Sequence, residues 1–121
     1  MISGEDLDAM GYSYYNEIPS LTVEDMVRKL RKDSGSELHP KLLREELEHY
    51  VRAWREAKTN AEELQAVAFI VWTAYELAVA KGYDLRTALE RTYMYDMSVY
   101  GLKEWNTEYN VDDLVKDAND E

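Results

Sequence analysis

The stretch NAEELQAVAFIVWTAYELAVAKG, residues 60–82, decides the fold. Asn60 can accept hydrogen bonds from the free N–H groups of a first helical turn, and Glu63 three residues later completes a capping box. Gly82 suits the left-handed position after a last turn. From Leu64 to Ala80 the polar side chains are limited to Gln65, Thr73 and Glu76. A helix that is apolar nearly all round is typically buried, so we predict a central helix covered by the rest of the chain.

Bulk composition restricts the function classes. The chain has 121 residues, which predicts one domain, 1–121. A net charge of −11 argues against direct binding to nucleic acid and is compatible with a cation site or a basic protein partner. No cysteine is present, which excludes disulfides and thiolate chemistry. We expect a cytoplasmic protein outside the membrane, because the start lacks an apolar leader and Glu76 would lie in the hydrocarbon of a span over the central stretch.

Two helices are predicted before the central one. Thr22 can cap a helix over 23–32, with Asp25 in the reciprocal position. Pro40 suits the first position of a second helix over 40–57. Apolar side chains recur at helical spacing in both segments. The short turn that follows makes the second helix an antiparallel neighbour of the central helix.

The remaining segments complete an all-α architecture. Asp84 can cap a fourth helix over 85–100. Residues 102–121 are acidic, but an apolar stripe over 111–118 predicts a short docked helix. Residues 1–20 are expected to be irregular. No segment alternates with period two, so we predict a four-helix core with a buried central helix and a short C-terminal helix.

Carboxylates gather on the two helices that flank the turn. Glu45, Glu46 and His49 lie within one turn in LREELEH, and Glu62 and Glu63 begin the central helix in AEELQAV. Hard cations such as Mg²⁺ take several oxygen ligands, which carboxylates from two facing helices can supply. Taken singly, each residue is better explained as part of a solvated face or a helix cap. Only the ordered set points to a site.

In that order, LREELEHYVRA, the central stretch with its GYDL turn, and YMYDMS resemble the MazG-like all-α nucleoside triphosphate pyrophosphohydrolases. The similarity covers roughly 42–100. The family pattern is E-E-x-x-E on one helix and E-x-x-D at the start of the next. The resemblance implies acids that bind Mg²⁺, hydrolysis of a nucleotide to its monophosphate and pyrophosphate, and a homo-oligomer.

Carried over residue by residue, the family's metal ligands fall on Glu45, Glu46 and Glu63. His49 stands where the third acid of the first helix belongs, and is the candidate catalytic residue as a ligand or proton carrier. Asp96 stands near the position expected to contact the nucleotide.

Other registers stay open. On the first helix, a shift by one keeps Glu45 and Glu48 but places Arg44 on the first acid. On the second, Glu63 is followed by Ala66 in the place of the aspartate, and a shift by one pairs Glu62 with Gln65 instead.

Because carboxylates are missing in every register, the resemblance implies a hydrolase of weak or absent activity. The alternative is a non-enzymatic acidic interaction or inhibitor protein, phage-type and mimicking nucleic-acid charge, that acts on the basic surface of a partner. Helical pairs of this kind commonly self-associate. A homo-oligomer with Trp72 and Glu76 at its interface is therefore a further hypothesis.

Overall fold

The computed structural model describes residues 21–101 and 109–115, and each regular element in these ranges is a helix. In chain order they are α3 (Val23–Ser34), α4 (Pro40–Glu56), α5 (Asn60–Lys81), α6 (Leu85–Val99) and the 3₁₀ turn η2 (Asp112–Val115). The all-α prediction is confirmed. The chain divides between Glu37 and Leu38 into two compact units, so α3 is described apart from the other helices.

The cap of α3 is the one that the sequence predicts. The Thr22 hydroxyl accepts the N–H of Asp25 at 3.1 Å, and the Asp25 carboxylate accepts the N–H of Thr22 at 3.3 Å. The helix continues two residues beyond the predicted end, to Ser34. It stops there because Gly35 takes a left-handed φ of 68° and its N–H binds the carbonyl of Arg31.

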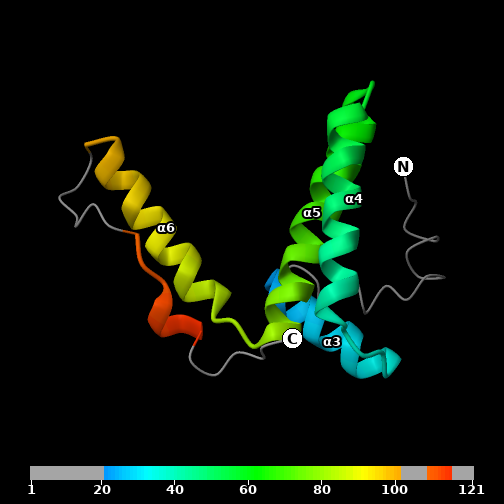
Figure 1. The fold of residues 1–121 in the computed structure, drawn as a ribbon, viewed down its shortest axis with the longest axis horizontal. Coiled ribbons are helices and arrows are strands. Elements are labelled where there is room, and N and C mark those ends of the chain that lie inside the picture. The colour runs from blue at the N-terminus through cyan, green and yellow to red at the C-terminus, as the bar shows by residue number, and fades with distance from the viewer. Residues whose placement is uncertain (1–20, 102–108, 116–121) are drawn as a thin grey trace, which may run out of the picture. The chain divides into compact units, whose positions relative to one another are not determined.

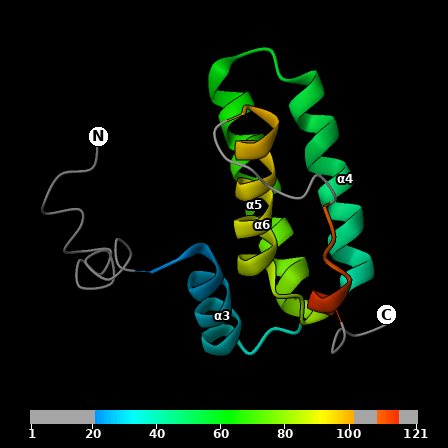
Figure 2. The same cartoon turned by 90° about the vertical axis from the view of Figure 1, so that its left-hand side faces the viewer.

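α4 and α5 run side by side in opposite directions and make the one extensive helix–helix contact of the described chain (Figures 1 and 2). Pro40 begins α4, where its missing N–H costs no intrahelical bond. Leu43 of α4 is buried, as are Ala66 and Thr73 of α5. Ala66 and Thr73 lie seven residues apart on one stripe, and their small side chains let the two helices approach closely.

The start of α5 differs from the prediction by one residue. Thr59, not Asn60, is the N-cap, and its hydroxyl accepts the N–H of Glu62 at 3.1 Å. The Glu62 carboxylate in turn accepts the N–H of Lys58 at 3.1 Å. The predicted pairing of Asn60 with Glu63 is therefore wrong, because the extended backbone of Thr59 already supplies the cap.

The structure does not clearly show α5 as a buried central helix. Leu64 is 70% exposed and Val71 is 44% exposed, and Val67 and Ala68 are exposed as well. The physical reason is the number of neighbours: α4 covers one stripe of a helix that is apolar on every side. Among the described helices α5 alone is long and apolar enough to cross a membrane, a test that the core helix of a soluble protein also passes.

α6 is held to the segment 109–115 by polar contacts. Arg91 donates to both carboxylate oxygens of Asp113, at 2.7 and 2.8 Å, and to the Asn110 carbonyl at 3.1 Å. The Tyr109 hydroxyl donates to the carbonyl of Ala88 at 3.1 Å and lies 2.8 Å from the Thr92 hydroxyl.

The ends of α6 agree with the sequence. The Asp84 carboxylate accepts the N–H of Thr87 at 3.1 Å, which confirms the predicted cap. Of the expected C-terminal helix over 111–118, the described part is the four-residue turn η2. The rest of that expectation, and the one for 1–20, concerns residues outside the described ranges.

Candidate functional site

A hollow of about 300 Å³ opens along one side of the α4–α5 pair. α4 contributes His49, Tyr50 and Ala53 to its lining. α5 contributes Glu62, Gln65, Ala66 and Phe69. The two sets meet because residues spaced by three and four share one side of a helix, and the antiparallel pairing brings those two sides together.

Aromatic rings form the floor of the hollow. The rings of Tyr50 and Phe69 are stacked, with centroids 4.8 Å apart and 15° between their planes. The imidazole of His49 meets the Tyr50 ring edge-on, at 5.4 Å and 64°. Phe69 remains 41% exposed, so its stacking on Tyr50 leaves part of this residue uncovered.

The position of Glu62 follows from the helix cap. Since Thr59 is the N-cap, Glu62 is the third residue of the first turn, and one of its carboxylate oxygens binds the N–H of Lys58. The same side chain lines the hollow. Glu63 does not line it, because one residue along a helix turns the side chain by about 100°.

The hollow therefore separates the two registers of the E-x-x-D pattern. Glu62 and Gln65 both line it, together with His49 from α4. In the other register Glu63 lies outside the lining, and Ala66, which lines the hollow but is buried, has no side-chain ligand atom. The sequence pattern predicted Glu63 as the ligand on the second helix. The feature that would have indicated Glu62 instead is Thr59, a capping residue three positions before it.

The other predicted site residues are dispersed. Glu45 is exposed on α4 and does not line the hollow. Asp96 lies exposed on α6 and is not part of the lining either. Glu46 is one turn before Tyr50 on α4, at the helical spacing that puts it on the same side of the pair.

Glu46 interacts with a second carboxylate, Glu76 of α5. Burial raises the pKa of the Glu76 carboxyl, and the negative charge of Glu46 raises it further. Glu76 interrupts the apolar run of α5, so its partial burial follows from the helix in which it sits. A cation that reached this side of the pair would relieve the repulsion between the two acids.

In residues 21–101 and 109–115, no three His, Asp or Glu side chains are gathered closely enough to hold a metal ion. The donors nearest to such a set are His49 and Glu62, with the amide of Gln65 beside them. Two carboxylates of the family pattern are replaced here, one by His49 and one by Gln65 or Ala66, depending on the register. The predicted Mg²⁺ site at Glu45, Glu46 and Glu63 stays a prediction.

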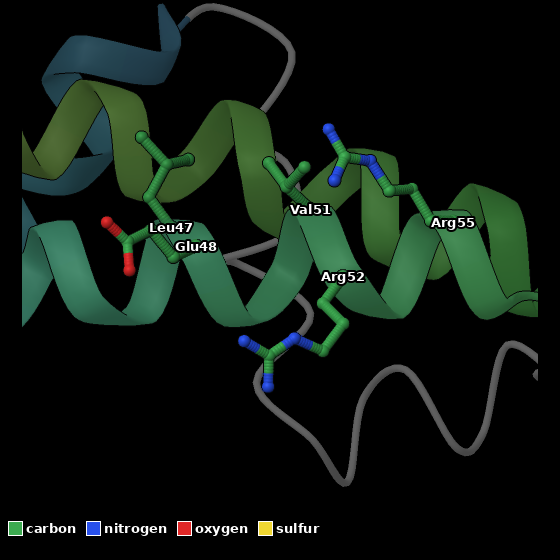
Figure 3. Close-up of a pocket in the computed structure, with 5 residues that line it drawn as sticks. All are labelled: Leu47, Glu48, Val51, Arg52 and Arg55. Atoms are coloured by element: carbon green, nitrogen blue, oxygen red, sulfur yellow. The ribbon is translucent and has the colours of Figure 1, made fainter.

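A second hollow, of about 430 Å³, lies against another side of α4 and is lined by Leu47, Glu48, Val51, Arg52 and Arg55. Figure 3 shows Leu47 and Val51 on the same side as Arg55, while the guanidinium of Arg52 points away. Of the acids weighed in the sequence analysis it contains Glu48, the candidate of the alternative register, and none of the other predicted site residues.

Comparisons of the chain with family models, with curated proteins and with solved structures find no match. The MazG-like resemblance therefore rests on the quoted motifs alone and remains a prediction.

Proposed function

We propose that this chain is an acidic, non-enzymatic interaction protein that assembles with a second copy of itself through α5. The observation that supports the proposal is a stripe of exposed apolar residues on α5. Its members are Leu64, Val67, Ala68 and Val71, at the i, i+3, i+4, i+7 spacing of one helix face. This set is called the outer stripe below.

The outer stripe lies on the side of α5 away from α4. Leu64 and Ala68 are two residues before Ala66 and two after it, about 160° from that contact position around the helix. α4 cannot cover both sides, so within the described residues these apolar side chains remain exposed. Full burial of one such side chain contributes about 1.5–3 kcal/mol, so covering several on each of two copies favours association.

A second copy fits the outer stripe by its chemistry. The stripe carries no charge, so it offers a charged partner nothing to pair with. Its equivalent on another copy is equally apolar, and a two-fold axis makes the same residues meet on both sides. Two α4–α5 pairs joined in this way would form a four-helix bundle, in which α5 becomes the inner helix that its composition predicts.

Sedimentation velocity over a wide range of concentration tests this assembly. We expect a concentration-dependent dimer or larger species, and we expect Val67→Gln with Val71→Gln to shift it towards the monomer. The matched control is Leu89→Gln, an exposed leucine on α6 that should leave the assembly unchanged. Circular dichroism checks that each variant is folded. A wild-type chain that stays monomeric throughout would refute the proposal.

Metal-assisted hydrolysis of a nucleotide is the second candidate. The observation that favours it is that His49, Glu62 and Gln65 line the same hollow between α4 and α5. Glu62 would be the carboxylate ligand of Mg²⁺, with His49 in the same hollow, and the ion would position water for attack on a phosphate. With two acids replaced, we expect little or no turnover. Magnesium-dependent release of pyrophosphate at ordinary enzymatic rates, lost in Glu62→Gln, would favour this candidate instead.

A further inference from the structure

The hollow between α4 and α5 combines an exposed ring with hydrogen-bond acceptors and holds no lysine or arginine among its described lining residues. The Phe69 ring is stacked on Tyr50 and is still 41% exposed. Glu62 uses one carboxylate oxygen for the N–H of Lys58, and in the described chain its other oxygen makes no hydrogen bond. The amide of Gln65 supplies a neutral acceptor beside it.

We infer that this hollow binds the guanidinium group of an arginine side chain on a basic protein partner. A guanidinium is planar, stacks on aromatic rings and presents several N–H donors in a fixed fork. Glu62 provides a carboxylate to which two N–H groups can donate. The apolar stem of the same arginine side chain can lie over the Phe69 ring, two turns further along α5. Lysine has the same charge but neither the plane nor the fork.

The surrounding charge favours a cation. Glu46, one turn before Tyr50 on α4, and Glu76, two turns after Phe69 on α5, extend the negative charge along the same side of the pair. The whole chain carries a net charge of −11, which attracts a basic surface over distance.

The size of the hollow favours a side chain over a nucleotide. Its volume of about 300 Å³ is at the lower limit of ligand pockets in proteins. A nucleoside triphosphate would also bring its own negative charge among Glu46, Glu62 and Glu76. This inference does not depend on self-association through the outer stripe, because the hollow lies on a different side of α5.

The probe is an acetylated, amidated peptide of alternating arginine and glycine, titrated into the full chain by isothermal calorimetry. The control peptide carries lysine in place of each arginine. We expect the arginine peptide to bind about fivefold to tenfold more tightly, since the paired hydrogen bonds to Glu62 are lost with lysine. The ring signals of His49 and Tyr50 in an NMR spectrum should shift on binding.

Two neighbouring variants make the test specific. Glu62→Gln keeps an acceptor for the N–H of Lys58 but removes the carboxylate, and we expect it to weaken the arginine peptide about tenfold. Glu63→Gln makes the same change of net charge one residue away and should have little effect. Phe69→Leu should leave the preference for arginine over lysine unchanged, because the apolar stem that lies over the ring is common to both side chains.

The inference would be overturned if Glu62→Gln and Glu63→Gln weakened binding of the arginine peptide equally, or if both peptides bound equally well. Either result would mean that the peptide binds by unspecific charge attraction. The inference would also be overturned if a nucleoside triphosphate shifted the same ring signals at a lower concentration than the peptide does. Because these titrations are performed in the monomeric Val67→Gln, Val71→Gln variant as well as in the wild type, a failure of self-association is distinguishable from a failure of the hollow.

Discussion

The ring of Tyr50 on α4 lies almost parallel to the ring of Phe69 on α5, with 4.8 Å between centroids. This contact joins residues on either side of the short turn and is part of the extensive α4–α5 interface. His49 and Glu62 lie on one side of the pair, where they line the same hollow. The local hollow depends on this pairing of the two helices.

A double-mutant cycle at Tyr50 and Phe69 tests that contact. We expect Tyr50→Leu and Phe69→Leu each to lower the free energy of unfolding. The loss of unfolding free energy in the double variant should be smaller than the sum of the losses in the two single variants. We expect the difference, which is the coupling energy of the stacked rings, to be about 0.5–1.5 kcal/mol. Urea denaturation measures all four proteins. A coupling of zero would mean that the rings do not stack in solution.

The N-cap of α5 predicts that substitutions at two adjacent residues, Thr59 and Asn60, have different effects on stability. Thr59→Ala should lower the free energy of unfolding by about 1 kcal/mol, because the N–H of Glu62 loses its partner. Asn60→Ala should cost nothing or slightly stabilise the protein, because alanine is the better helix former. Chemical denaturation of the two variants decides between them, and the reverse order of stability would restore Asn60 as the cap.

Glu76 makes stability depend on pH. Burial, and then the charge of Glu46, raises the pKa of the Glu76 carboxyl above 4.5, so the folded chain holds the proton more tightly than the unfolded chain does. The free energy of unfolding therefore falls as the pH rises from 4.5 through the folded-state pKa. We expect Glu76→Gln to raise Tm at neutral pH, with a gain that vanishes as the pH approaches 4.5.

Two further variants separate the causes. Glu46→Gln should give a smaller gain than Glu76→Gln, because it removes the repulsion and leaves the burial of Glu76 unchanged. Glu45→Gln, an exposed carboxylate on the same helix, is the control and should not change the pH dependence. A Glu76→Gln variant with no gain at neutral pH would contradict this account.

Arg91 should control the order of the segment after α6. Its two donations to Asp113 and one to Asn110 tie residues 109–115 to α6, together with the hydroxyl of Tyr109. We expect Arg91→Ala to speed hydrogen exchange of the Leu114 N–H and to leave α4 and α5 unaffected. Arg86→Ala is the control, because the ion pair that Arg86 makes in the described chain is with Glu90 on its own helix, at 3.6 Å. Equal exchange in both variants would show that the Arg91 contacts do not order the segment.

The two proposals predict opposite responses to salt. Self-association joins uncharged stripes on chains of net charge −11 each, so added salt should strengthen it by screening the repulsion. Binding of the arginine peptide joins opposite charges and should weaken as salt rises. Sedimentation and calorimetry at low and high ionic strength measure the two trends. A dimer that dissociates in salt would contradict assembly through the outer stripe.

Local signals in the sequence determined most of the helical boundaries. The caps at Thr22 and Asp84 and the left-handed glycine at Gly82 involve partners within a few residues, so the residue types alone predict them. The same holds for α4 and α5 as antiparallel neighbours, because the turn between them is short. The exception, Thr59 in place of Asn60, arose where two adjacent residues can both cap a helix.

Tertiary structure decided the side on which each acid lies and how much of α5 is covered. Glu62 and Glu63 are alike in type and differ by one position, yet the packing against α4 puts only Glu62 in the hollow. The composition of α5 fixes that it is apolar all round. Whether such a helix is buried depends on how many neighbours pack on it, and within the described chain only α4 packs on it extensively, which leaves Leu64 and Val71 in water. The hydrophobicity of a side chain is a property of its residue type, whereas its burial depends on which other surfaces pack against it.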